Sequence, residues 1–150
     1  MSRLWQSLRR DRRGAVVIEA AFVAPILALL GLGGFQVSQA VARQHELQTG
    51  ADDAAAMALA GWQDDAAQVT ALRNVLKTTL NLTDAKVGVT HKYRCGTAAA
   101  YVDVKTACAA GTIVTTYLRI ALTDTYTPKW VDFGIGSPIN FSVTRTVVLS

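Results

Sequence analysis

The stretch Arg12-Arg13-Gly14-Ala15-Val16-Val17-Ile18-Glu19 marks an abrupt change in the character of this chain. The residues before the glycine are rich in arginine. From residue 15 to residue 35 the chain is almost purely apolar, and Glu19 is its only ionisable residue there. A run of about 20 apolar residues is long enough to cross the hydrocarbon core of a membrane as a helix. We therefore expect a basic leader over residues 1–14 and a transmembrane helix over residues 15–36.

The charge of the chain is unevenly distributed. The chain has 15 basic and 11 acidic residues. Five of the basic residues and one of the acidic residues lie in residues 1–14, so the rest of the chain carries ten of each. A neutral globular part offers no basic surface to a nucleic-acid backbone, so we expect no nucleic-acid partner. The basic cluster instead predicts, by the positive-inside rule, a cytoplasmic N-terminus and an extracytoplasmic domain over residues 37–150.

The carboxylate of Glu19 needs an explanation, because charged side chains inside membrane segments are costly and usually functional. One alternative is a plain, unprocessed membrane anchor in which this side chain reaches back to the interface and the periplasmic domain binds a partner. Another is a secretory signal peptide cleaved near Ala40, in Ser38-Gln39-Ala40, which would release a soluble domain. The apolar run is longer than the roughly 7–15 residues of a signal peptide's apolar region.

Helical periodicity continues beyond the membrane segment. Over residues 36–60 the apolar residues recur on one helix face, which predicts a single long N-terminal helix. Its later part carries a stripe of small residues that we expect to cover the protein's own sheet: Ala51, Ala54, Ala55 and Ala58. Asp64 and Asp65 supply an N-cap and negative charge in the first turn for a second helix, which we expect to end at Asn81 or Thr83.

After the second helix the apolar period changes to two, which predicts strands. The candidates are residues 87–95, 101–104, 112–126 and 139–149. Helices followed by grouped strands favour an α+β fold, here two helices and an antiparallel sheet of about four strands. Arg145 interrupts the apolar face of the last strand. It lies either near the end of the sheet or in an ion pair with an acid such as Asp103 or Asp124.

Cys95 and Cys108 are the two cysteines of the chain. Because the predicted topology places both outside the cytoplasm, we expect a disulfide, which would close a loop of about 14 residues. Two reduced cysteines or a metal site that also uses His45 and His91 are the alternatives. The spacings match no zinc-binding pattern, so we expect no metal.

Catalytic patterns are also missing from the sequence. It contains no Gly-x-Ser-x-Gly motif of the kind that exposes a nucleophilic serine. The carboxylate pairs Asp52-Asp53 and Asp64-Asp65 are adjacent in sequence, and adjacent residues of a helix point in different directions. We therefore expect no enzyme activity, no cofactor and no small-molecule substrate.

Taken together, the basic leader, Gly14, Glu19, the long helix and the small β-rich tail with one cysteine pair resemble the TadE family. Its members are pseudopilins or minor pilins of the tight-adherence (Flp) type IVb pilus system. The resemblance is strongest over residues 12–61, and the sister family TadF, which shares this N-terminal signature, is the close alternative.

The resemblance implies a processing site. A prepilin peptidase would cut between Gly14 and Ala15, with Arg12, Arg13 and Glu19 taking part in recognition or assembly. The new amine of Ala15 would then pair with the carboxylate of Glu19, often on a neighbouring subunit, which offsets the cost of burying either charge.

The resemblance also implies where the protein works. It would be held in the bacterial inner membrane with a periplasmic C-terminal domain, and its partners would be other Tad pilins and assembly proteins. It would act in pilus biogenesis and surface adherence, either from the membrane or as part of the extracellular pilus.

Overall fold

We analysed a computed structural model that describes residues 12–61 and 65–149, without the side chains of residues 12–15 and Phe133. The chain divides into two compact units, Met1–Gln39 and Ala40–Ser150, and each is described by itself. Most of the predicted leader, together with Trp62 and Asp64, lies outside the described residues.

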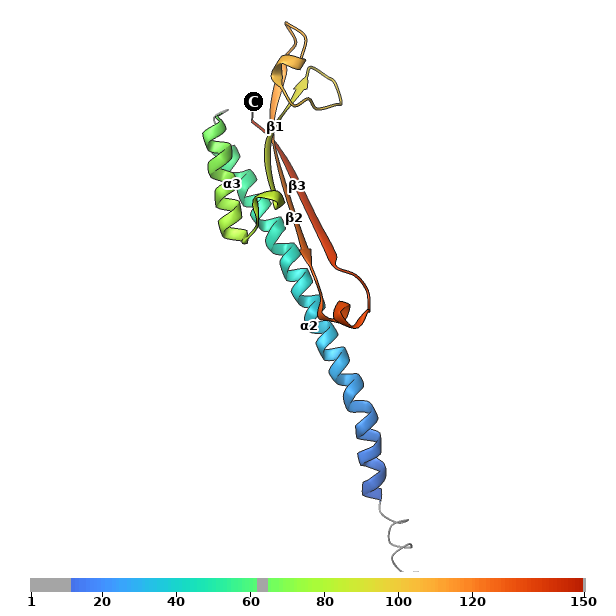
Figure 1. The fold of residues 1–150 in the computed structure, drawn as a ribbon. Helices are drawn as coiled ribbons and strands as arrows, with labels where there is room; N and C mark the ends of the chain where they lie inside the picture. The colour runs from blue at the N-terminus through green and yellow to red at the C-terminus, as the bar shows by residue number, and fades with distance from the viewer. Residues whose placement is uncertain (1–11, 62–64, 150) are drawn as a thin grey trace, which may run out of the picture. The chain divides into compact units, whose positions relative to one another are not determined.

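Two helices form as the sequence predicts (Figure 1). Helix α2 spans Arg12–Leu59 and includes Pro25, and helix α3 spans Ala66–Leu80. The N-cap of α3 is Asp65, whose carboxylate accepts a hydrogen bond of 3.0 Å from the amide of Ala67. The helix ends at Asn81, which takes the left-handed conformation with φ of 52° and donates its amide to the carbonyl of Lys77.

The strands form one antiparallel sheet in the order β1-β2-β3. Strand β1 spans Val87–Cys95, β2 spans Val114–Tyr126 and β3 spans Ile139–Val148. The α+β class is confirmed, with three strands in place of about four. Ten consecutive residue pairs join β2 to β3, from Tyr126↔Ile139 to Tyr117↔Val148.

The predicted strand at residues 101–104 is wrong. Only Val102 pairs with β1, through two backbone hydrogen bonds with Tyr93 of 2.9 and 2.8 Å. The chain turns into a short 3-10 helix at Lys105–Ala107 and is tied to the end of β1 by the Cys95–Cys108 disulfide. A strand forms only where several consecutive residues run alongside a neighbouring strand. Because the chain turns away here, Val102 is the one residue of this segment that stays in register with β1.

The core of the Ala40–Ser150 unit lies between the two helices and one face of the sheet. The sheet contributes alternate residues of each strand, and the centre of β2 is fully buried at Leu118, Ile120 and Leu122. Helix α3 contributes Leu72, Leu76 and Leu80. The small stripe of α2 packs in this core, as predicted: Ala51, Ala54, Ala55 and Ala58, with Leu47. Because these side chains are short, the helix backbone can approach the sheet closely.

Candidate processing and assembly segment

The predicted processing site lies at the beginning of α2. The backbone of Arg12, Arg13, Gly14 and Ala15 is helical there, and their side chains are not described. Residues four apart on a helix lie on the same face, about one turn apart. Ala15 and Glu19 therefore lie one above the other on α2.

The helix that follows presents an apolar surface to its surroundings. Its large apolar side chains are between 44% and 73% exposed over residues 16–35, a high exposure for this residue class. The exposed set is Val16, Val17, Ile18, Phe22, Val23, Ile26, Leu27, Leu29, Leu30, Leu32 and Phe35. Among the described residues, α2 is the one helix long and apolar enough to cross a membrane, judged by length and composition. This surface is suited to membrane anchoring.

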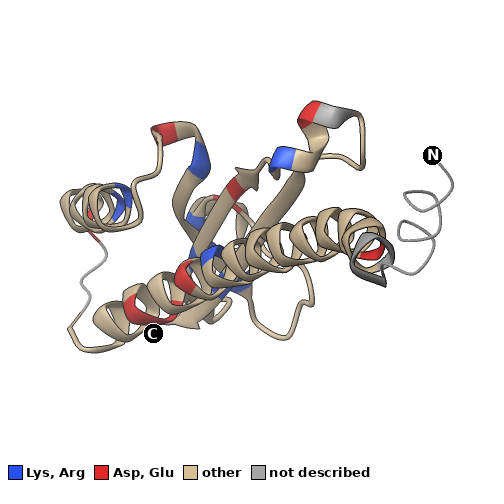
Figure 2. Cartoon of the chain, turned by 90° about the horizontal axis from the view of Figure 1, so that it is seen from below, with Lys and Arg blue, Asp and Glu red and all other residues tan. Residues whose placement is uncertain are grey.

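Glu19 is the one charged residue between positions 16 and 42. Figure 2 shows that much of α2 is tan, the colour of residues that are neither basic nor acidic. The side chain of Glu19 is exposed, and it makes no ion pair or hydrogen bond with the described residues.

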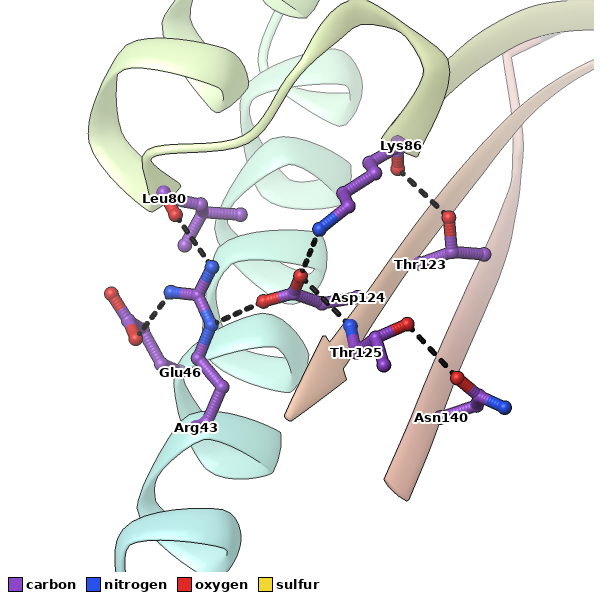
Figure 3. A network of polar contacts seen from close by, with 8 residues as sticks. All are labelled: Arg43, Glu46, Leu80, Lys86, Thr123, Asp124, Thr125 and Asn140. Carbon is purple, nitrogen blue, oxygen red and sulfur yellow. Dashed lines mark hydrogen bonds and ion pairs between the residues drawn. The ribbon is translucent and has the colours of Figure 1, made fainter. Parts of the chain in front are cut away.

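In the Ala40–Ser150 unit, a polar network joins α2 to the ends of β2 and α3 (Figure 3). Arg43 of α2 donates from Nε to the Asp124 carboxylate at 2.7 Å, and from Nη2 to the carbonyl of Leu80 at 2.9 Å. Its third nitrogen, Nη1, donates to Glu46 at 2.7 Å. Asp124 also accepts from Nζ of Lys86 at 2.6 Å. One guanidinium thus links three elements of the unit.

The network keeps its charges ionised despite partial burial. Burial opposes ionisation of Asp124, but its hydrogen bonds with Lys86 and Arg43 outweigh this and lower the pKa of the carboxyl. For Arg43, burial again opposes the charge, and the hydrogen bonds to Glu46 and Asp124 outweigh it and raise the pKa of the guanidinium. The network was missed in the sequence, although Asp124 follows the inward alternation of Leu118, Ile120 and Leu122.

Arg145 pairs with neither of the acids that the sequence suggested. Its Nε donates to Asp52 on α2. Asp124 is taken by Arg43 and Lys86, and Asp103 pairs with Lys92. Arg145 lies on the inward side of β3, so it faces the helix that carries Asp52. An ion pair was one of the two possibilities that the sequence left open, and the structure has one, with an acid on the helix in place of Asp103 or Asp124.

The two cysteines form the disulfide that the sequence led us to expect, with a Cα–Cα distance of 5.4 Å. It joins the end of β1 to the segment that connects β1 with β2, and Tyr101 of this segment lies on the sheet face opposite the helices. On that face Tyr101 packs edge-on against Tyr117 at 5.1 Å between ring centroids, and the guanidinium of Arg94 lies 5.7 Å from the Tyr117 ring centroid. The disulfide thus supports a small aromatic and cationic cluster.

These residues define a single apolar helix, suited to a membrane, that continues into a compact α+β unit. In a comparison with protein-family models, residues 14–56, which lie in α2, match the family described as TadE-like protein. The match confirms the TadE resemblance over these residues and does not separate TadE from TadF. No curated protein and no solved structure matched the chain.

Proposed function

We propose that this chain is a minor pilin or pseudopilin of a Tad (Flp) type IVb pilus assembly system, acting in pilus biogenesis and surface adherence. The observation that carries the proposal is the TadE-like match, which begins at Gly14 and includes Glu19. The exposed apolar surface of α2 supports a membrane-held state of the subunit. In this role the chain is a structural component and not a catalyst.

The proposed processing divides the chain at Gly14. A prepilin peptidase of the bacterial inner membrane removes residues 1–14, and residues 15–36 hold the mature chain in that membrane. Residues 37–150 lie in the periplasm. Glycine has no side chain beyond Cα, so the bond after Gly14 can enter a narrow active site. Arg12 and Arg13 keep the leader on the cytoplasmic side.

Glu19 then acts in assembly. Cleavage leaves a positively charged amine on Ala15, one helical turn from Glu19 on the same face. When subunits pack side by side, the carboxylate of Glu19 and this amine both lose their water. An ion pair between them then offsets the desolvation cost of both groups. Among the described residues, Glu19 has no other partner. The partners are other Tad pilins and the assembly proteins that admit subunits to the pilus.

The first test is the intact mass and N-terminal sequence of the chain, taken from membranes of cells that carry the peptidase. We expect a chain that starts at Ala15, and we expect Gly14→Val to start at Met1. Gly31→Val is the matched control, because a Cβ at Gly31 meets nothing within 4 Å, and it should be processed normally. A wild-type chain starting at Met1 would indicate a plain anchor, and one starting near Val41 a secreted soluble domain.

The second test separates assembly from processing. Glu19→Val should be cut after Gly14 yet fail to support pilus formation, because the amine of Ala15 loses its carboxylate. The control is Phe22→Val, which changes an exposed apolar side chain one turn away and leaves the carboxylate in place. Pili are counted on cells that express each variant. Normal pilus numbers with Glu19→Val would refute the proposed role of Glu19.

A further inference from the structure

The outer edge of β3 has unused backbone hydrogen-bonding groups. The amide of Leu149 donates to the carbonyl of Thr116 at 2.9 Å. This bond shows which residues of β3 direct their backbone groups toward β2 and which direct them outward. In an antiparallel pair every second residue bonds to the neighbouring strand, so the alternate residues direct their amides and carbonyls outward. The outward set is Asn140, Ser142, Thr144, Thr146 and Val148. Within the described parts of the chain, no backbone hydrogen bond from outside the sheet reaches them.

The two edges of the sheet differ in how they are protected. On β1, Tyr93 exchanges both of its outward backbone bonds with Val102, so the edge is partly occupied. Among the residues that the structure describes, no segment pairs with the outer edge of β3 in this way, and its ten-residue register contains no proline and no bulge. Its one charged side chain, Arg145, faces Asp52 on α2. Natural proteins usually block such an edge, because it is a template for pairing with another chain.

The sheet face opposite the helices is positively charged. It carries Lys92, Arg94 and Arg119 from β1 and β2, and no acidic side chain of the strands shares it. Lys92 is neutralised by Asp103 from the connecting segment. Arg119, in contrast, is exposed and makes no ion pair or hydrogen bond with the residues that the structure describes.

Arg119 lies next to the open edge. It is directly opposite Thr146 in the register of β2 and β3. A hollow of about 250 Å³ is lined by Lys92, Tyr101, Arg119, Thr144 and Thr146. Between Arg119 and the edge, β3 carries the small, exposed side chains of Thr144 and Thr146. A carboxylate on a strand added beside β3 would therefore lie within reach of the guanidinium.

The strand direction disfavours a second copy of this chain as the occupant. Arg43 contacts Asp124, which pairs with Phe141 early in β3, and Asp52 contacts Arg145 later in β3. Helix α2 and β3 therefore run in the same direction within the Ala40–Ser150 unit. An antiparallel pair of two β3 strands would place the two Ala40 ends at opposite ends of the pair. Two copies held in one membrane, as in the proposed function, could not adopt that arrangement.

We propose that the outer edge of β3 and Arg119 together bind an extended acidic segment of another protein, which adds a fourth strand antiparallel to β3. The backbone of β3 supplies the affinity through the outward groups of Ser142, Thr144 and Thr146. The segment places alternate side chains on the positively charged face, where a carboxylate pairs with Arg119. This mode of binding is strand addition, in which main-chain hydrogen bonds supply the affinity for the segment and side-chain contacts supply the specificity.

The probe is an acetylated and amidated peptide, Thr-Val-Glu-Val-Glu-Val-Thr, added to the full chain in a non-ionic detergent. Residue-resolved amide hydrogen exchange should show protection of Ser142, Thr144 and Thr146, with no change at Val143 and Arg145. The matched peptide with lysine in place of both glutamates should bind about tenfold more weakly, as expected for reversing an exposed cross-strand charge pair. Equal binding of both peptides would overturn the acidic specificity.

Two variants test the geometry. Arg119→Glu changes an exposed side chain, so the fold is retained, and it should make the lysine peptide the tighter binder. Thr144→Pro removes an outward amide and should abolish protection, whereas Thr144→Ala keeps the amide and should bind as the wild type does. Absence of peptide binding to the wild-type chain would refute the proposal. Concentration-dependent protection of the same amides without peptide would show instead that two copies pair, which also overturns it.

Discussion

Replacing Asp124 with asparagine removes the negative charge at the centre of the network in Figure 3 while keeping the size of the side chain. The side chain of Asp124 is only 11% exposed, and that of Arg43 is 21% exposed, so this pair is poorly screened by solvent. Hydrogen bonds to charged groups contribute about 1.5–3 kcal/mol. Lys86 is 38% exposed, so its pair with Asp124 is counted as a surface pair of about 0.5 kcal/mol.

Arg43 keeps its bonds to Glu46 and to the carbonyl of Leu80 in the variant, which limits the loss. We therefore expect Asp124→Asn to lower the free energy of unfolding of the Ala40–Ser150 unit by about 2 kcal/mol, or its Tm by about 8 °C. Thermal unfolding of the full chain in detergent, followed by near-ultraviolet circular dichroism, measures this. Asp53→Asn is the matched control, because Asp53 is exposed and has no ion pair among the described residues; its change should stay within about 0.5 kcal/mol.

The pH dependence tests the cause of this loss. The pKa of Asp124 is lowered in the folded state, so its stabilising contribution is complete above the unfolded value of about 3.9. The contribution is lost as the pH falls through the lower folded pKa, where the wild-type carboxyl becomes neutral. The stability difference between wild type and Asp124→Asn should therefore be constant from neutral pH to about pH 5 and vanish in stronger acid. A difference that persists unchanged in strong acid would refute the electrostatic explanation.

Two further predictions concern the packing and the covalent link of the same unit. A Cβ at Gly50 would lie 2.8 Å from Cδ1 of the buried Leu80. Gly50→Val should therefore destabilise the unit by about 2 kcal/mol, measured by thermal unfolding. An unchanged Tm would show that α3 moves away at no cost. Reducing the Cys95–Cys108 disulfide, whose cysteines are 13 residues apart, should lower the free energy of unfolding by about 3 kcal/mol. Added reductant should leave the double variant Cys95→Ser/Cys108→Ser unaffected.

Local patterns in the sequence predicted most of the elements correctly. The apolar stripe predicted α3 after Asp64-Asp65 and up to Asn81 or Thr83, and the structure has its caps at Asp65 and Asn81. Strict alternation predicted β1 over Val87–Cys95. The region of residues 101–104 has alternating residues too, but the disulfide and the following turn allow pairing at Val102 alone. Alternation shows that a segment fits a strand, but the pairing depends on how long the chain stays beside its neighbour.

The candidate processing segment was visible in the sequence because all of its signals lie close together. Gly14, Ala15 and Glu19 fall within a single basic-to-apolar transition, and the TadE-like match over residues 14–56 includes these three residues. The edge of β3 and its neighbour Arg119 could not be read in this way. Whether a strand lies at an edge depends on the order β1-β2-β3, which arises only when all the strands have paired.

By itself, the sequence determined the long apolar helix, the second helix with its caps, and the two-residue alternation of the strands. Each of these depends on residues within a few turns of one another, so short-range hydrophobic spacing and backbone preferences suffice. The tertiary structure alone decided the partners of the charges. Arg43 finds Asp124 across 81 residues of sequence, and Arg145 finds Asp52 across 93. Many opposite charges are available at such separations, and only the packing of α2 against the sheet selects among them.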